Sequence, residues 1–127
     1  MGNGSSELHE EGLPPDVIDR HRAVRSMMEE LEAVDWYDQR VAATSDADLA
    51  EVLAHNRDEE KEHFAMTLEW LRRRDRKLDE VLRTYLFADG DILAVEEEAE
   101  ARDHDAGASA AGDLRIGSLR GESEEQR

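Results

Sequence analysis

The sequence predicts an all-α fold, in which an antiparallel hairpin of two long helices plus a short C-terminal helix becomes a four-helix bundle when two copies associate. Apolar residues recur at helical spacing over two long stretches, and a connection of only a few residues makes the two helices antiparallel neighbours. The 127-residue chain has a mean hydropathy of -0.79 and 5% aromatic residues. Such a composition supports little monomeric core, so we expect disordered segments, a core completed by association, or both.

Charge and composition narrow the classes of partner. The chain has 33 acidic and 16 basic residues, and its formal net charge of -17 disfavours nucleic acid and anionic membranes but suits cations. It contains no Cys, which rules out disulfides, thiolate metal sites and Cys nucleophiles. No run of about 18 apolar residues occurs. We therefore expect no nucleic-acid partner, no membrane partner and a cytoplasmic location.

The first long helix is predicted from Val17 to about Thr44. Residues 1–13 are rich in Gly, Ser and acids and lack periodicity, so we expect them to be disordered. Pro14-Pro15-Asp16 favours a helix start, because Pro suits the first turn and Asp complements the helix dipole. The apolar residues of this helix form one stripe about 80° wide: Ala23, Met27, Leu31, Val34 and Val41.

The second long helix is predicted from about Ala47 to Arg74, after a short turn over residues 44–48 that supplies an N-cap. A third, shorter helix is expected from about Leu78 to Phe87, and residues 92–95 can add one more turn. The apolar positions of the second helix are Leu49, Leu53, Phe64, Leu68 and Leu71.

The composition changes after the third helix. We place the helical domain at residues 14–95 and expect an acidic, flexible linker at residues 96–112. A small apolar island follows at residues 113–121, and residues 122–127 are expected to be disordered.

A carboxylate interrupts the apolar stripe of the second helix. Glu60 falls at the centre of that stripe, and His63 lies one turn on, about 60° to one side of the same face. Glu30 borders the matching stripe of the first helix. A carboxylate turned toward a core costs several kcal/mol unless it is compensated. Glu-x-x-His on such a face indicates a metal ion held between helices.

These residues amount to half of a carboxylate-bridged di-iron site. The four-helix di-iron pattern takes one Glu from each of two helices and one Glu-x-x-His from each of the other two. One chain supplies Glu30, Glu60 and His63, so two copies related by a two-fold axis supply the full set. Four glutamates carry about as much negative charge as two ferrous ions carry positive charge. We therefore predict a homodimer as the site-forming unit, whose association metal promotes.

Other interpretations of these residues stay open. A lone Glu on an apolar stripe is most often a boundary residue that reaches solvent, and Glu-x-x-His also arises by chance in acidic helices. Tyr37, two turns after Glu30, either hydrogen-bonds a ligand, takes part in electron transfer or simply packs. Glu29, Glu32 and Trp36 cluster on the opposite face, as an acidic site that collects cations or as an ordinary solvated surface.

Three motifs closely resemble the encapsulated ferritins, a ferritin-like family: MEELEAVDWY at residues 28–37, HNRDEEKEH at residues 55–63 and MTLEW at residues 66–70. The resemblance extends from Asp19 to Phe87. It implies a helical-hairpin protomer whose dimers bind iron between subunits and assemble into an annular decamer. It also implies ferroxidase activity, in which Fe(II) is oxidised to Fe(III) at ligands that match Glu30, Glu60 and His63, with Tyr37 beside them.

The resemblance also gives the outer acidic face an expected role. The positions through which iron reaches the site in that family match Glu29 and Glu32, with Trp36 nearby, and other divalent cations such as calcium can occupy them. No departure from the family occurs at these positions or at the ferroxidase ligands; the differences lie in the N-terminal extension and the linker.

The apolar island resembles the C-terminal targeting peptide by which cargo docks inside encapsulin shells. Leu114, Ile116 and Leu119 would fill pockets of the shell protein, and Gly117 permits a bend. The resemblance therefore implies a protein inside an encapsulin nanocompartment, where the shell stores the iron that the protein oxidises. Two alternatives remain: a non-enzymatic helical adaptor, and a di-iron oxidoreductase of another kind, such as a peroxidase-like enzyme.

Overall fold

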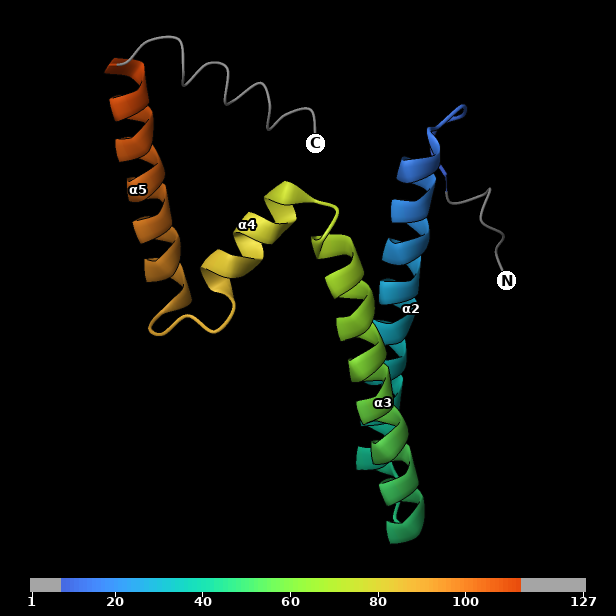
Figure 1. Cartoon of the computed structure of the whole chain (residues 1–127). Coiled ribbons are helices and arrows are strands. Elements are labelled where there is room, and N and C mark those ends of the chain that lie inside the picture. The colour runs from blue at the N-terminus through green and yellow to red at the C-terminus, as the bar shows by residue number, and fades with distance from the viewer. Residues whose placement is uncertain (1–7, 113–127) are drawn as a thin grey trace. The chain divides into compact units, whose positions relative to one another are not determined.

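The computed structural model describes residues 8–112, and helix is the only regular secondary structure among them (Figure 1). The chain divides into two compact units between Leu71 and Arg72. The first unit contains the two long helices, and the second contains two further helices. The helices are α2 (Pro15–Ala43), α3 (Ala47–Arg72), α4 (Arg76–Tyr85) and α5 (Ile92–Gly112). The all-α prediction is confirmed, and no described helix is both long and apolar enough to cross a membrane.

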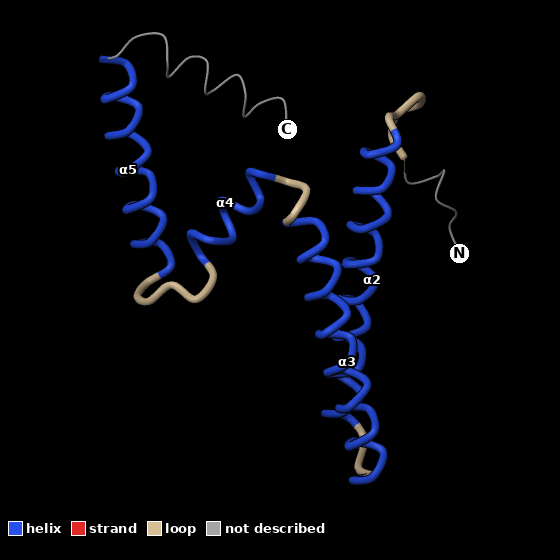
Figure 2. The backbone as a smooth tube through the Cα atoms, viewed as in Figure 1, coloured by secondary structure: helices blue, strands red, loops and turns tan. Residues whose placement is uncertain are grey.

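Helices α2 and α3 form the predicted hairpin, and a connection of three residues joins them (Figure 2). Pro occupies the first turn of α2, where its missing N–H is not needed. The helix ends where the N–H of Thr44 bonds to the carbonyl of Arg40 at 3.0 Å. Asp46 then caps α3, because its carboxylate accepts a hydrogen bond from the N–H of Leu49 at 3.0 Å. Both helices begin and end within two residues of their predicted bounds.

Few apolar side chains of the hairpin are buried within one chain. Ala23 and Leu71 are the buried apolar residues of the described part, each 8% exposed. The register of the two helices is instead marked by an ion pair, in which Arg57 Nη1 lies 2.8 Å from Asp38 Oδ1. Large apolar side chains remain about half exposed along both helices: Met28, Leu31, Leu49, Val52 and Met66. A single hairpin thus leaves much of its apolar surface uncovered.

A carboxylate clamp shapes the start of the second unit. Asp75 caps α4 by accepting from the N–H of Leu78 at 2.9 Å. Asp79 accepts hydrogen bonds from Arg72 and from Arg83, whose Nε lies 2.9 Å away. Burial works to raise the pKa of Asp79, but the two arginines outweigh it and hold that pKa below its ordinary value. The clamp therefore ties Arg72, the first residue of this unit, to the first turns of α4.

Helix α5 differs from the flexible linker expected at residues 96–112, and this expectation is corrected. The helix runs from Ile92 to Gly112 and contacts α4. Asp91 starts it by accepting from the N–H of Ala94 at 3.1 Å. Ala and Glu, which abound here, are strong helix formers and need no apolar stripe to favour a helix. The preceding turn contains Phe87 and Gly90, both with positive φ.

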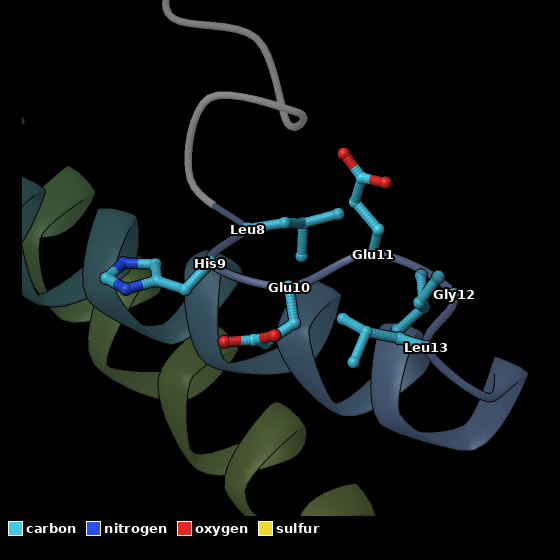
Figure 3. Close-up of a pocket in the computed structure, with 7 residues that line it drawn as sticks. Leu8, His9, Glu10, Glu11, Gly12 and Leu13 are labelled. Carbon is cyan, nitrogen blue, oxygen red and sulfur yellow. The ribbon is translucent and has the colours of Figure 1, made fainter.

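The segment before α2, residues 8–13, contains no helix or strand. Residues 8–13 follow a defined irregular path and, with Ile18, line a hollow of about 460 Å³ (Figure 3). Gly12 has a φ of 69°, a conformation that favours glycine. The predicted disorder of residues 1–13 stays a prediction, and residues 1–7 lie outside the described part. The apolar island at residues 113–121 and the end at residues 122–127 also lie outside it.

Candidate metal centre

Glu30 is the most unusual side chain of the hairpin. Its Oε1 atom is buried and has no hydrogen-bond partner in the described part of the chain. Burial raises the pKa of Glu30, and the negative charge of Glu60 raises it further, whereas His63 works to lower it. A carboxylate oxygen that loses water and gains no donor is costly to fold. A positive charge close to Glu30 would therefore lower the free energy of the folded site.

Glu60 and His63 lie opposite Glu30 on α3. The antiparallel hairpin brings them near it, as their electrostatic effect on its pKa shows. They are one turn apart, with His63 Nδ1 3.7 Å from Glu60 Oε1. The Glu60 side chain is 28% exposed and that of His63 is 48% exposed, so water reaches both side chains in the single chain. Glu60 and His63 are thus neighbours on α3, and the charges of both act on Glu30 of α2.

The donor set fits a hard divalent metal ion such as iron. Two carboxylates and one imidazole are the ligand types that non-haem iron sites use. The buried, unpartnered oxygen of Glu30 and its repulsion by Glu60 are both conditions that a bound cation would relieve. Within the described part of one chain, no three His, Asp or Glu side chains are arranged to hold a metal ion by themselves.

An arginine that the sequence prediction missed, Arg40, contacts the ring of Tyr37. The guanidinium carbon of Arg40 lies 5.6 Å from the centre of the Tyr37 ring and 5.9 Å from that of Trp36. Both distances suit cation–π attraction. The i, i+3 and i, i+4 spacings permit this contact on a helix, but the choice of rotamer does not follow from spacing. Arg40 therefore contacts both the Tyr37 ring and the Trp36 ring.

The outer acidic pair is also less isolated than the sequence prediction assumed. Arg25 Nη2 lies 3.5 Å from Glu29 Oε2, and the Glu29 side chain is 63% exposed. Glu32 and Trp36 are exposed on the same helix. The i, i+4 spacing of Arg25 and Glu29 on a helix is the sequence signal for this ion pair. The pair thus carries less net negative charge than its two carboxylates alone would give.

A helical hairpin with Glu on one helix and Glu-x-x-His on the next defines a ferritin-like helical protein. The comparison with protein families agrees, because residues 6–89 match the EncFtn-like family model. The chain belongs to this family of encapsulated ferritins.

Curated relatives and a solved structure agree with that assignment. The chain is 57% identical over 131 residues to the "Encapsulated ferritin-like protein" of Rhodospirillum rubrum, a match covering 96% of this chain and 94% of the relative. It is 52% identical over 98 residues to the "Ferritin-like protein" of Thermotoga maritima, covering 77% and 82%. The crystal structure of a Nitrosomonas europaea protein matches with a TM-score of 0.66 and 51% identity, covering 71% of this chain and 98% of that one.

Proposed function

We propose that this protein is a ferroxidase, which oxidises Fe(II) to Fe(III) at a di-iron site shared between two subunits. The observation that carries the proposal is the buried, unpartnered carboxylate oxygen of Glu30 beside Glu60 and His63. Glu30, Glu60 and His63 of each copy hold the iron. Two ferrous ions neutralise four glutamates, which removes the repulsion that each chain carries alone.

Association of two copies is supported by the surface of the hairpin. His63 is about half exposed and Glu60 is partly exposed, and the long helices leave large apolar side chains about half exposed. A second copy packed on this face would bury that apolar surface and bring the second set of ligands across a two-fold axis. We further propose that such dimers assemble into an annular decamer, as the family resemblance implies.

In the proposed reaction dioxygen is the electron acceptor. Each ferrous ion gives up one electron, so a pair of irons and two protons reduce one dioxygen to hydrogen peroxide. Carboxylates favour the ferric product because the higher charge binds them more strongly. Tyr37, whose ring Arg40 contacts, would act as a hydrogen-bond donor or electron carrier, the role that the family resemblance implies for it. Glu29 and Glu32 attract incoming Fe(II), and other divalent cations such as calcium can bind there.

The iron is stored elsewhere, because an open ring offers no closed cavity. We propose that ferric product passes to the lumen of an encapsulin shell, in which residues 113–121 anchor the protein. The name of the Rhodospirillum rubrum relative supports an encapsulated protein. Deleting residues 113–127 should abolish loading into a co-expressed shell while leaving iron oxidation intact; unchanged loading would contradict the anchor.

The test of ferroxidase activity is anaerobic loading with Fe(II), followed by air, while ferric absorbance is recorded. Glu60→Ala should lose most of the fast oxidation that the wild type shows. Glu51→Ala is the matched control, because it removes the same charge from an exposed position of α3. Oxidation equally slow in all three proteins, and no faster than in buffer, would instead favour a helical adaptor without enzymatic activity.

A further inference from the structure

An arginine already occupies the position of a cation at the outer acidic pair. Arg25 and Glu29 are one turn apart on α2, and Arg25 Nη2 lies 3.5 Å from Glu29 Oε2. The Arg25 side chain is 35% exposed and that of Glu29 is 63% exposed. A cation arriving at Glu29 therefore meets a guanidinium rather than an open carboxylate.

Along one face of α2, an arginine lies on each side of the acidic pair Glu29 and Glu32. At about 100° per residue, Arg25, Glu29, Glu32, Trp36 and Arg40 share a stripe about 80° wide. Arg40 is drawn onto the rings of Trp36 and Tyr37, at 5.9 and 5.6 Å from the ring centres. Its positive charge limits the acidic patch on that side. Arg25 limits the patch on the other side and makes direct contact with a carboxylate.

We infer that Arg25 is a built-in counter-cation, which competes with incoming divalent cations for Glu29 and so keeps their binding weak and brief. The inference rests on the proposed function, in which Glu29 and Glu32 collect Fe(II). A patch that feeds an oxidation site must release cations as well as attract them. Arg25 supplies that release, because its guanidinium returns to Glu29 when the cation leaves.

The strength of the Arg25–Glu29 pair suits such an exchange. An exposed ion pair one helical turn apart is weak and gives way to a stronger charge. A divalent cation carries twice the charge of the guanidinium and can bridge Glu29 and Glu32, whereas a monovalent cation gains little over Arg25. Arg25 therefore also favours divalent over monovalent cations at this surface.

The test uses terbium as a cation probe, with luminescence excited through the tryptophans of the full-length chain. Trp36 lies one turn from Glu32, so bound terbium near the pair is sensitised. The component of the signal lost in Glu29→Gln reports this site. Arg25→Gln should raise its affinity by roughly two- to fivefold and slow terbium release to a chelator. Arg25→Lys, which keeps the charge, should stay near the wild type.

The matched control is Arg22→Gln. Arg22 lies on the same helix, is more exposed and pairs with Asp19 at 2.9 Å, so its loss changes net charge equally. Equal affinities in Arg25→Gln and Arg22→Gln would overturn the inference, as would a signal that does not depend on Glu29. Neither result touches the ferroxidase proposal, which stands or falls on the loss of iron oxidation in Glu60→Ala.

Discussion

At the scale of single residues, Glu30 departs furthest from the packing rules that the rest of the hairpin obeys. Polar atoms buried without a partner cost about 1–3 kcal/mol, and native proteins keep few of them. The buried Oε1 of Glu30 is such an atom, and neighbouring Glu60 adds repulsion. Strain of this kind commonly marks a functional position. Glu30 is thus the residue whose environment bears most directly on function.

The raised pKa of Glu30 makes stability depend on pH in a definite direction. The folded metal-free chain holds the Glu30 proton more tightly than the unfolded chain does. The stability that this group contributes is therefore complete below the unfolded pKa of 4.5 and is lost as pH rises through the folded pKa. Above that range the charged carboxylate lowers the free energy of unfolding.

Glu30→Gln should remove this penalty, because the amide carries no charge at any of these pH values. In chelator-treated protein, urea unfolding should show the variant to be more stable than the wild type by about 1 kcal/mol at pH 7. The difference should shrink as pH falls toward 5. The same variant should lose iron oxidation. A variant less stable than the wild type at pH 7 would show that the carboxylate is satisfied without metal.

The site could be predicted from the sequence only in part at this scale. Helical periodicity was enough to place Glu60, His63 and Glu30 near one another, because their positions follow from the backbone. The contacts of Arg25 and Arg40 could not be read in the same way. Long flexible side chains choose among many rotamers, and spacing alone allows several partners for each.

At the scale of helices, the sequence was most informative where apolar residues repeat. The bounds of α2, α3 and α4 were predicted to within two residues, since their stripes and end signals agree. Helix α5 was missed because it has no apolar stripe, and its helical tendency resides in Ala and Glu propensity. A segment whose residues favour helix but whose apolar residues do not repeat at helical spacing is easily mistaken for a linker.

A proline substitution tests whether α5 is a helix in solution. Ala99→Pro removes a backbone donor from its interior and should cost about 3 kcal/mol of local helix stability. Carbon chemical shifts of residues 92–107 should be helical in the wild type and lose this character around position 99. Ala99→Gly should have a smaller effect. Random-coil shifts in the wild type would show that this segment is a flexible linker and not a helix.

The Asp79 clamp should make α4 sensitive to acid. The pKa of Asp79 is lowered, because hydrogen bonds from Arg72 and Arg83 outweigh the effect of burial. Its contribution to stability is thus present above the unfolded pKa of 3.8 and is lost as pH falls through the folded pKa. Asp79→Asn should speed amide hydrogen exchange in α4 at neutral pH.

Glu80→Gln is the control for the clamp, since Glu80 pairs only loosely with Lys77 at 3.5 Å. Protection of the α4 amides should be unchanged in that variant. Equal exchange rates in the Asp79 and Glu80 variants would mean that the clamp contributes nothing to the helix.

At the scale of the whole molecule, the described part of one chain buries little of its apolar surface. Ala23 and Leu71 are the only buried apolar residues of that part, each still 8% exposed, and the chain carries a net charge of -17. Apolar surface favours association of copies, while like charge opposes it. Cations at the glutamates would reduce this repulsion. Metal binding and assembly are therefore expected to be coupled.

The most direct test of the shared site is native mass spectrometry of the full chain, metal-free and after anaerobic addition of Fe(II). We predict that iron shifts single chains toward dimers and larger assemblies, that only these assemblies carry iron, and that each reaches one iron per chain. Glu60→Ala should lose this firmly bound iron, and iron should not shift its assembly. Iron bound as firmly to single chains, or an assembly pattern that iron leaves unchanged, would contradict a site built from two subunits.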